Sequence, residues 1–225
     1  MISSAWDRRI ERAEELAKTC APAAEMLRFY GEIARLQKTI YQQQPSDVLP
    51  HLPALLKLVK RIGPAPLVRM AEECAGVEEG SFFERCLLQP SYEYRAGQSA
   101  IARDAVQPDC PFCGERPQVG VLRGEGDGAK RSLICSLCST EWDFRRLLCP
   151  SCGEENPDRL PVYTAEELPY VRIEACDTCH MYIKAVDLSR NGLAVPVVDE
   201  LATVSLNLWA EEHGYTKVQV NLLGV

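Results

Sequence analysis

The sequence predicts an α+β protein in which an N-terminal all-α helical domain is followed by two tandem cysteine-rich β-ribbons and a C-terminal helix. Three observations predict this order: apolar residues at helical spacing over 1–105, four CxxC pairs between Cys110 and Cys179, and another helical apolar stripe over 198–213. We therefore divide the chain into a helical domain, a first ribbon, a second ribbon, and a C-terminal helix and tail that pack on the ribbons. These segments are 1–105, 106–148, 149–190 and 191–225.

The N-terminal helices are predicted from apolar periodicity and from residues that begin or end helices. Ser4 can cap a first helix, and Pro22 suits the first turn of a second. Gly63 and Pro64 close a third. The apolar stripes are expected to form a core, with a partner groove as the alternative. The expected helices cover about 4–19, 22–43, 51–62, 65–75, 79–88 and 91–105.

Short alternating strands and turn residues distinguish the cysteine-rich region. Gln118–Arg123 and Arg131–Ile134 flank the turn sequence GEGDG, which predicts a β-hairpin. Two further strands, one helix and an edge strand are expected at Val171–Glu174, Met181–Val186, Val198–His213 and Val218–Leu223.

The four CxxC pairs use eight of the eleven cysteines. Two cysteines at a tight turn can place both sulfurs on one metal ion, and two such turns complete a tetrahedral thiolate site. The pairs form an internal repeat, CPFCGE…ICSLC followed by CPSCGE…ACDTC, which favours a sequential assignment and leaves interleaved ligation as the alternative. The expected ligands are Cys110, Cys113, Cys135 and Cys138 for one metal, and Cys149, Cys152, Cys176 and Cys179 for the other.

Both four-cysteine sites are expected to be closed to further ligands. Four thiolates leave no position for water or substrate, so a structural or one-electron role is favoured over hydrolysis. Rubredoxin-type iron and zinc-ribbon zinc use the same ligands, so the metal is iron or zinc. The first interpretation is that the metals replace a missing core, and a redox or metal-sensing role is the alternative. In each unit, Gly114 or Gly153 follows the first pair and fits a turn that needs positive φ.

Other candidate residues receive simpler interpretations. His180 is a possible substitute ligand, but with four cysteines available it is expected to be exposed or bridging. We find no catalytic constellation, and so predict that the chain is not an enzyme. The remaining cysteines are expected as small buried apolar residues, with a reactive thiol as the alternative. The acidic residues near the CxxC turns, or knuckles, are expected as a solvated rim, with a specific contact role as the alternative. These two groups are Cys20, Cys74 and Cys86, and Glu141, Asp143, Glu174 and Asp177.

The composition of the chain indicates its cellular compartment and the class of its binding partners. The first residues contain no signal-peptide apolar region and no run approaches the about 20 apolar residues of a membrane span, so we expect a cytoplasmic protein without membrane insertion. Reduced thiols in that compartment favour metal ligation over disulfides. The net charge of −7 lies entirely on 106–225. Because phosphate binding needs a positive surface, protein partners are favoured over nucleic acid. The sequence leaves a homodimer open.

At the cysteine motifs the chain resembles a known family. CPFCGERPQVGVL, LICSLCSTEWDFRRLLCPSCG and VRIEACDTCHMYIKAVDL are similar to segments of the formate dehydrogenase accessory protein FdhE. The resemblance covers about 110–188 densely, and the helical N-terminal half agrees in type. This chain is shorter than typical members, with the deficit in the N-terminal half.

The resemblance implies a cytoplasmic maturation factor without catalytic residues. Such a factor binds the catalytic (alpha) subunit of formate dehydrogenase, a molybdenum or tungsten enzyme, and is required for assembly of its active form. It also implies rubredoxin-like iron binding by the eight cysteines above. Two other functions stay open: a rubredoxin-like one-electron carrier or redox sensor, and a zinc-ribbon nucleic-acid binder, which the acidity of 106–225 disfavours.

Overall fold

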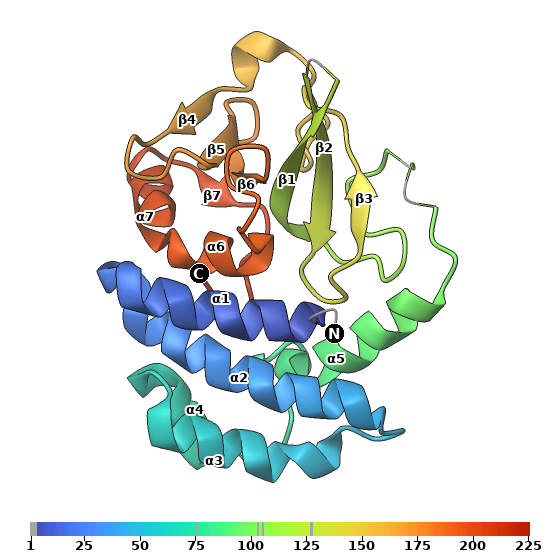
Figure 1. Cartoon of the computed structure of the whole chain (residues 1–225), viewed down its shortest axis with the longest axis vertical. Coiled ribbons are helices and arrows are strands. Elements are labelled where there is room, and N and C mark those ends of the chain that lie inside the picture. The colour runs from blue at the N-terminus through green and yellow to red at the C-terminus, as the bar shows by residue number, and fades with distance from the viewer. Residues whose placement is uncertain (1–3, 75, 103, 105, 127) are drawn as a thin grey trace.

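The predicted α+β order is confirmed by a computed structural model that describes residues 4–74, 76–102, 104, 106–126 and 128–225. Figure 1 shows the first five helices as one layer and a mixed sheet as the other, with the last two helices against the sheet. The helices are α1 (Ala5–Thr19), α2 (Ala24–Gln43), α3 (Leu52–Ile62), α4 (Ala65–Glu73), α5 (Phe82–Gln98), α6 (Pro196–Ala202) and α7 (Val204–Glu212). Short 3-10 turns occur at Ala21–Ala23, Leu49–His51 and Pro157–Arg159.

The helix starts follow from the predicted capping residues. The Ser4 hydroxyl accepts a hydrogen bond from the Asp7 amide at 3.1 Å, and the Asp7 carboxylate accepts one from the Ser4 amide at 3.2 Å. These two bonds form a capping box that satisfies amides at the start of α1. Pro22 lies in the 3-10 turn that leads into α2.

The apolar stripes of the helices are buried, as expected for a core. Trp6, Leu16 and Leu27 pack with Val198 and Leu201 of α6. A second cluster fills the space between α2, α3 and α5. None of the helices built from described residues has both the length and the apolar character needed to cross a membrane.

Some predicted segments include residues that lie outside the described part of the chain. These are Ala75 and the pair Arg103 and Ala105, from the predicted helices 65–75 and 91–105, and Asp127 from the predicted GEGDG turn.

The prediction of two helices over 79–88 and 91–105 is wrong, because one helix, α5, continues through Pro90. Proline has no amide proton, so the carbonyl four residues earlier loses its helical partner. That carbonyl belongs to Cys86, and the side-chain amide of Gln37 in α2 donates to it at 2.9 Å. A neighbouring helix thus supplies the donor that Pro90 lacks.

Within the described residues, seven strands form one sheet in the order β3-β2-β1-β6-β5-β4, and β7 also pairs with β6. The predicted hairpin is confirmed as β1 and β2, and the next two predicted strands as β5 and β6. The two cysteine-rich segments therefore contribute to one sheet, and the four-part division of the chain stays a prediction. The strands are β1 (Pro117–Glu125), β2 (Gly128–Cys135), β3 (Glu141–Asp143), β4 (Val162–Thr164), β5 (Val171–Cys176), β6 (Met181–Asp187) and β7 (Thr216–Lys217).

The two halves of the sheet meet where β1 and β6 pair in parallel. Gly120 of β1 lies opposite Ala185 of β6. A Cβ atom at position 120 would lie 3.3 Å from the Ala185 Cβ, which is tighter than ordinary contact. The missing side chain therefore allows the two strands to approach closely at the junction.

The predicted single helix over Val198–His213 is also wrong, because Thr203 separates α6 from α7. The Lys184 ammonium donates to the carbonyl oxygens of Glu200 at 2.5 Å and Thr203 at 3.2 Å. Because the Lys184 side chain of β6 binds these carbonyls, it stabilises the break in the helix.

The predicted edge strand Val218–Leu223 is not formed. Strand pairing is assigned instead to the preceding residues of β7, Thr216 and Lys217. Beyond them the Asn221 side-chain oxygen accepts bonds from the amides of Leu223 at 3.0 Å and Val225 at 3.3 Å. These local bonds curl the tail and compete with strand pairing.

Two adjacent carboxylates of α6, Asp199 and Glu200, are both fully buried. Asp199 pairs with Arg12 of α1 at 2.6 Å. Glu200 pairs with Lys184 of β6 at 2.9 Å and also with Lys217 of β7. Burial opposes ionisation of Glu200, but the two ammonium groups outweigh it and lower its pKa to about 2. Burial lowers the pKa of Lys184 to about 8, against the opposing effect of Glu200. Glu200 and Lys184 are therefore both charged at neutral pH.

Replacement of Gln37 by alanine is expected to lower the free energy of unfolding by about 1–3 kcal/mol, because the buried Cys86 carbonyl loses its donor. Denaturant unfolding of the variant measures this loss. Gln42→Ala, at an exposed position of the same helix, is the control. Equal stability of the two variants would contradict the role assigned to Gln37.

Replacement of Glu200 by glutamine tests the buried charge cluster. A carboxyl with a lowered folded-state pKa adds stability that is present above its ordinary pKa of 4.5 and is lost as the pH falls toward 2. The free energy of unfolding of wild type should therefore exceed that of Glu200→Gln by about 3 kcal/mol at pH 7, and this gap should shrink below pH 4.5. Unfolding free energies across this range measure the gap, and exposed Glu166→Gln should show none.

Candidate metal centres

The structure brings the eight predicted cysteines together in two groups, in the sequential grouping and not the interleaved one. Within each group the four sulfur atoms lie within 4.8 Å of one another. The first centre consists of Cys110, Cys113, Cys135 and Cys138, and the second of Cys149, Cys152, Cys176 and Cys179.

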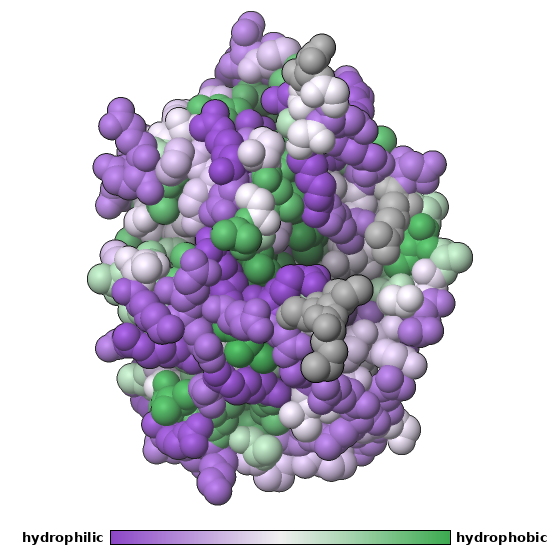
Figure 2. Space-filling model, in the orientation of Figure 1, coloured by the Kyte–Doolittle hydropathy of each residue, from purple (hydrophilic) through white to green (hydrophobic). Residues whose placement is uncertain are grey.

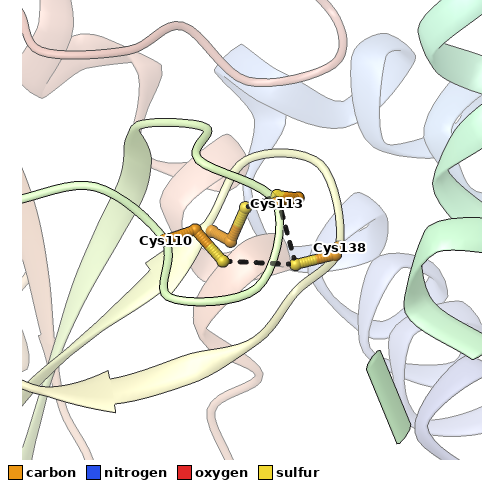
Figure 3. Close-up of side chains that lie close together, drawn as sticks. Cys110, Cys113 and Cys138 are labelled. Carbon is orange, nitrogen blue, oxygen red and sulfur yellow. Dashed lines mark hydrogen bonds between the residues drawn. The ribbon is translucent and has the colours of Figure 1, made fainter. Parts of the chain in front are cut away.

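The sulfur separations suit a tetrahedral metal ion. In the first centre Cys110 and Cys138 are 3.5 Å apart, and Cys113 is 3.4 Å from Cys135. Figure 3 shows the sulfur atoms of Cys110, Cys113 and Cys138 turned toward one another. In the second centre the corresponding separations are 3.7 Å. Metal–sulfur bonds of about 2.3 Å in a tetrahedron place the sulfurs about 3.8 Å apart, so both sets of residues fit such an ion.

The first knuckle of each centre has the predicted turn. Gly114 and Gly153 take φ values of 78° and 77°, which glycine adopts without strain. In both turns an amide donates to the first cysteine sulfur at 3.4 Å, from Phe112 to Cys110 and from Ser151 to Cys149. The repeat seen in the sequence is thus a repeat of backbone geometry.

The second knuckles have a feature that the sequence analysis missed. Ser139 and His180, each directly after the last cysteine of its centre, take φ values of 54° and 55°. A left-handed conformation costs a residue other than glycine about 1–2 kcal/mol, so the surrounding turn must hold it there. Ser139 and His180 occupy equivalent positions in the sequence repeat, and this equivalence could have indicated that they share a turn conformation. The His180 side chain is exposed, as expected, and lies outside both groups of sulfurs.

The first centre is bonded to the helical layer through α5. The Arg85 guanidinium donates to the Ser136 hydroxyl at 3.1 Å and pairs with Glu115 at 3.3 Å. The Gln89 side-chain amide donates to the Ser136 carbonyl at 2.9 Å. Ser136 lies inside one knuckle and Glu115 follows the other, so α5 contacts both turns of this centre. No motif in the sequence marked Arg85 or Gln89.

The second centre is held by groups of its own ribbon and of the C-terminal tail. The Thr178 hydroxyl donates to Glu154 at 2.6 Å, which joins its two knuckles. The Tyr215 hydroxyl donates to Asp177 at 2.6 Å. Cys152 is exposed and Cys179 is half-buried. This centre therefore lies at the surface.

The prediction of a solvated acidic rim is wrong for Glu174. This carboxylate lies on the sheet between Arg131 at 2.7 Å and Arg172 at 2.6 Å. Burial opposes its ionisation, but the two guanidinium groups outweigh burial and lower its pKa. Asp177, as described above, accepts from Tyr215. Glu141 and Asp143 pair with Arg123 and Lys130.

The three cysteines outside the centres belong to the helical half. Cys86 is fully buried, as predicted, and burial raises the pKa of its thiol. Cys20 and Cys74 are only half-buried, since each packs at the edge of a helical core.

The thiols of the two centres must lose protons to bind a metal. Burial raises the pKa of Cys179 to about 12 and also raises that of Cys149. Four crowded sulfurs cannot all ionise without a cation, because like charges at this distance repel. A metal ion would supply that cation, and four sulfur ligands would then leave no open position for substrate.

The chain is similar to proteins of one family along its cysteine-rich half. Residues 109–146 match the family model described as "FdhE, central domain", and residues 148–223 match "FdhE, C-terminal domain". The "Protein FdhE homolog" of Aquifex aeolicus is 44% identical over 117 residues, which are 51% of this chain and 41% of the relative. The homolog of Shewanella oneidensis is 36% identical over 119 residues, which are 53% of this chain and 39% of the relative. The chain thus matches about two fifths of the length of these relatives.

A solved structure extends the similarity in fold to the helical half. The crystal structure of the FdhE protein from Pseudomonas aeruginosa superposes with a TM-score of 0.81. It covers 98% of this chain and 95% of that chain at 24% sequence identity, and so shows the same fold. With both family models matched in order over the two metal centres, the chain belongs to the FdhE family.

Proposed function

We propose that the eight clustered cysteines hold two metal ions, iron or zinc, as closed tetrathiolate centres. The sulfur separations, the repeated turns and the amide donors to sulfur support this assignment. The centres supply rigid cross-links within the sheet and, with iron, one-electron chemistry.

The function that these features support best is that of a cytoplasmic accessory factor in formate dehydrogenase maturation. The chain binds the catalytic subunit of that molybdenum or tungsten enzyme and holds it until the active enzyme is assembled. Membership of the FdhE family is the observation that carries this proposal. A closed metal site has no position for substrate, so the proposed role is binding and not catalysis.

A client-binding surface is proposed on the helical half. Leu49, Ile62 and Met70, from the segment between α2 and α3 and from α3 and α4, expose 53%, 40% and 45% of their surface. Figure 2 shows a face that is mainly hydrophilic, with apolar residues in small separate patches. Such modest apolar area suits a transient client, because weak interfaces are small.

A one-electron carrier is the second candidate. The exposure of Cys152 favours it, because electrons pass more readily through a ligand that lies at the surface. This function predicts reversible one-electron reduction of the iron-loaded protein and activity without a client.

Metal analysis tests the two centres directly. We expect two metal ions for each chain, and one after Cys176→Ser. Affinity should fall as pH falls, because protons compete for thiols such as Cys179, whose pKa burial raises to about 12. Elemental analysis and competition with a chelator from pH 8 to pH 6 measure both quantities. Cys86→Ser, outside the centres, should keep two ions.

An affinity experiment tests the accessory role. Tagged chain is incubated with an anaerobic lysate that contains formate dehydrogenase, and bound proteins are identified by mass spectrometry. We expect enrichment of the catalytic subunit by wild type. Loss in Cys176→Ala/Cys179→Ala, with binding retained in the control Cys20→Ala/Cys74→Ala, would connect docking to the second centre.

Two other outcomes of this experiment have different meanings. Retained binding in both double variants would support the helical half as the docking surface. No enrichment of the dehydrogenase by wild type would contradict the accessory role and leave the two metal centres in place.

A further inference from the structure

We infer that the two metal centres have different roles. The first stabilises the fold and keeps its metal as long as the protein is folded, and the second exchanges its metal while the protein stays folded. The inference rests on the proposed metal occupancy. It concerns the difference between the centres, which the repeat in the sequence does not reveal.

The first centre is enclosed by the core. Cys110, Cys135 and Cys138 expose at most 3% of their surface. Trp142 and Ile183 belong to the apolar cluster that contains them. A chelator reaches these sulfurs only after core side chains move apart, so release of this metal requires at least local unfolding.

The first centre is also the place where α5 is bonded to the cysteine-rich half. Arg85 and Gln89 bond to Ser136 between Cys135 and Cys138, and Arg85 pairs with Glu115 next to the other knuckle. If the knuckles separate, these bonds between the helical layer and the sheet are lost as well. Metal release at this centre is therefore coupled to loss of tertiary structure.

The second centre is open at its first knuckle. Cys152 is exposed, whereas the equivalent Cys113 of the first centre is half-buried. Glu154 and Thr178 join the two knuckles by a side-chain hydrogen bond. Because that bond lies at the surface and Cys152 is exposed, this knuckle can open without movement of core side chains.

A cleft reaches the second centre at its buried cysteines. This cleft has a volume of about 390 Å³, and Cys149 and Cys176 contribute to its lining. Leu147 and Val162, which expose 53% and 50% of their surface, also line it. Cavities of this size accept small organic molecules. A small thiol or chelator can therefore approach this centre at Cys152, whereas Cys149 and Cys176 expose only 4% and 2% of their surface beside the cleft.

Exchange at the second centre is a ligand substitution without electron transfer. Cys152 would be the ligand that an incoming thiolate or chelator replaces, and the released Cys152 thiolate would take a proton from water. Replacement of the other three sulfurs completes removal of the metal. The ligand class is thus a soft divalent cation, passed between this centre and another thiolate or nitrogen donor.

The test uses the full chain loaded with two equivalents of Zn²⁺ and mixed with excess 4-(2-pyridylazo)resorcinol, whose zinc complex is coloured. We expect release in two phases of one equivalent each, with rates that differ at least about tenfold. Samples alkylated with iodoacetamide and mapped by mass spectrometry identify the cysteines freed in each phase. The fast phase should free cysteines of the second centre with near-ultraviolet circular dichroism unchanged. The slow phase should free the cysteines of the first centre, and the near-ultraviolet circular dichroism signal should be lost at the same time.

Matched variants give a second measurement. Cys113→Ser and Cys152→Ser change the equivalent ligand of each centre, and we expect a larger fall in melting temperature for Cys113→Ser. Binding of fewer than two Zn²⁺ ions by wild type would overturn the proposed centres and this inference together. Two ions released at one rate, or a fast phase that frees the first centre, would overturn the inference alone.

Discussion

Adjacent buried carboxylates on α6 fix the two layers of this protein relative to each other. Asp199 faces Arg12 of the helical layer, and Glu200 faces Lys184 and Lys217 of the sheet. A buried charge without its partner costs about 3–5 kcal/mol, so neither layer can shift without a large penalty. The short helix α6 therefore sets the relative position of elements that are far apart in the chain.

The metal centres depend on that arrangement in unequal ways. The first lies where the sheet meets α5, and Arg85 and Gln89 bond to its knuckles across the layers. The second lies on the ribbon that β4 and β5 build, where Tyr215 of the tail holds Asp177. Although the two ribbons repeat in sequence and in turn geometry, the helical layer covers one more closely than the other. The difference between the centres arises from tertiary packing.

Local signals predicted much of this structure, and distant partners account for what they missed. Ser4 and Gly114 act within a few residues of themselves, and the repeat of the CxxC pairs indicates which cysteines group together, so the capping bond, the turn and the grouping could be predicted from the sequence. The helix through Pro90 depends on Gln37, and the break at Thr203 depends on Lys184. The burial of Glu174 likewise depends on Arg131 and Arg172. No periodicity in the sequence identifies such partners, and the parallel pairing of β1 with β6 has the same origin.

A rigid scaffold with one exchangeable centre suits a factor that binds an immature enzyme. With the metals proposed above, the buried charges and the first centre would keep both layers in place whether or not the second centre holds its ion. Partner binding at the second ribbon can then depend on metal occupancy without depending on folding. A chain with two equally buried centres could not separate these properties, because loss of either metal would also disrupt the surface that the partner recognises. In the accessory role proposed above, the exposure of Cys152 would allow metal exchange while the fold stays intact.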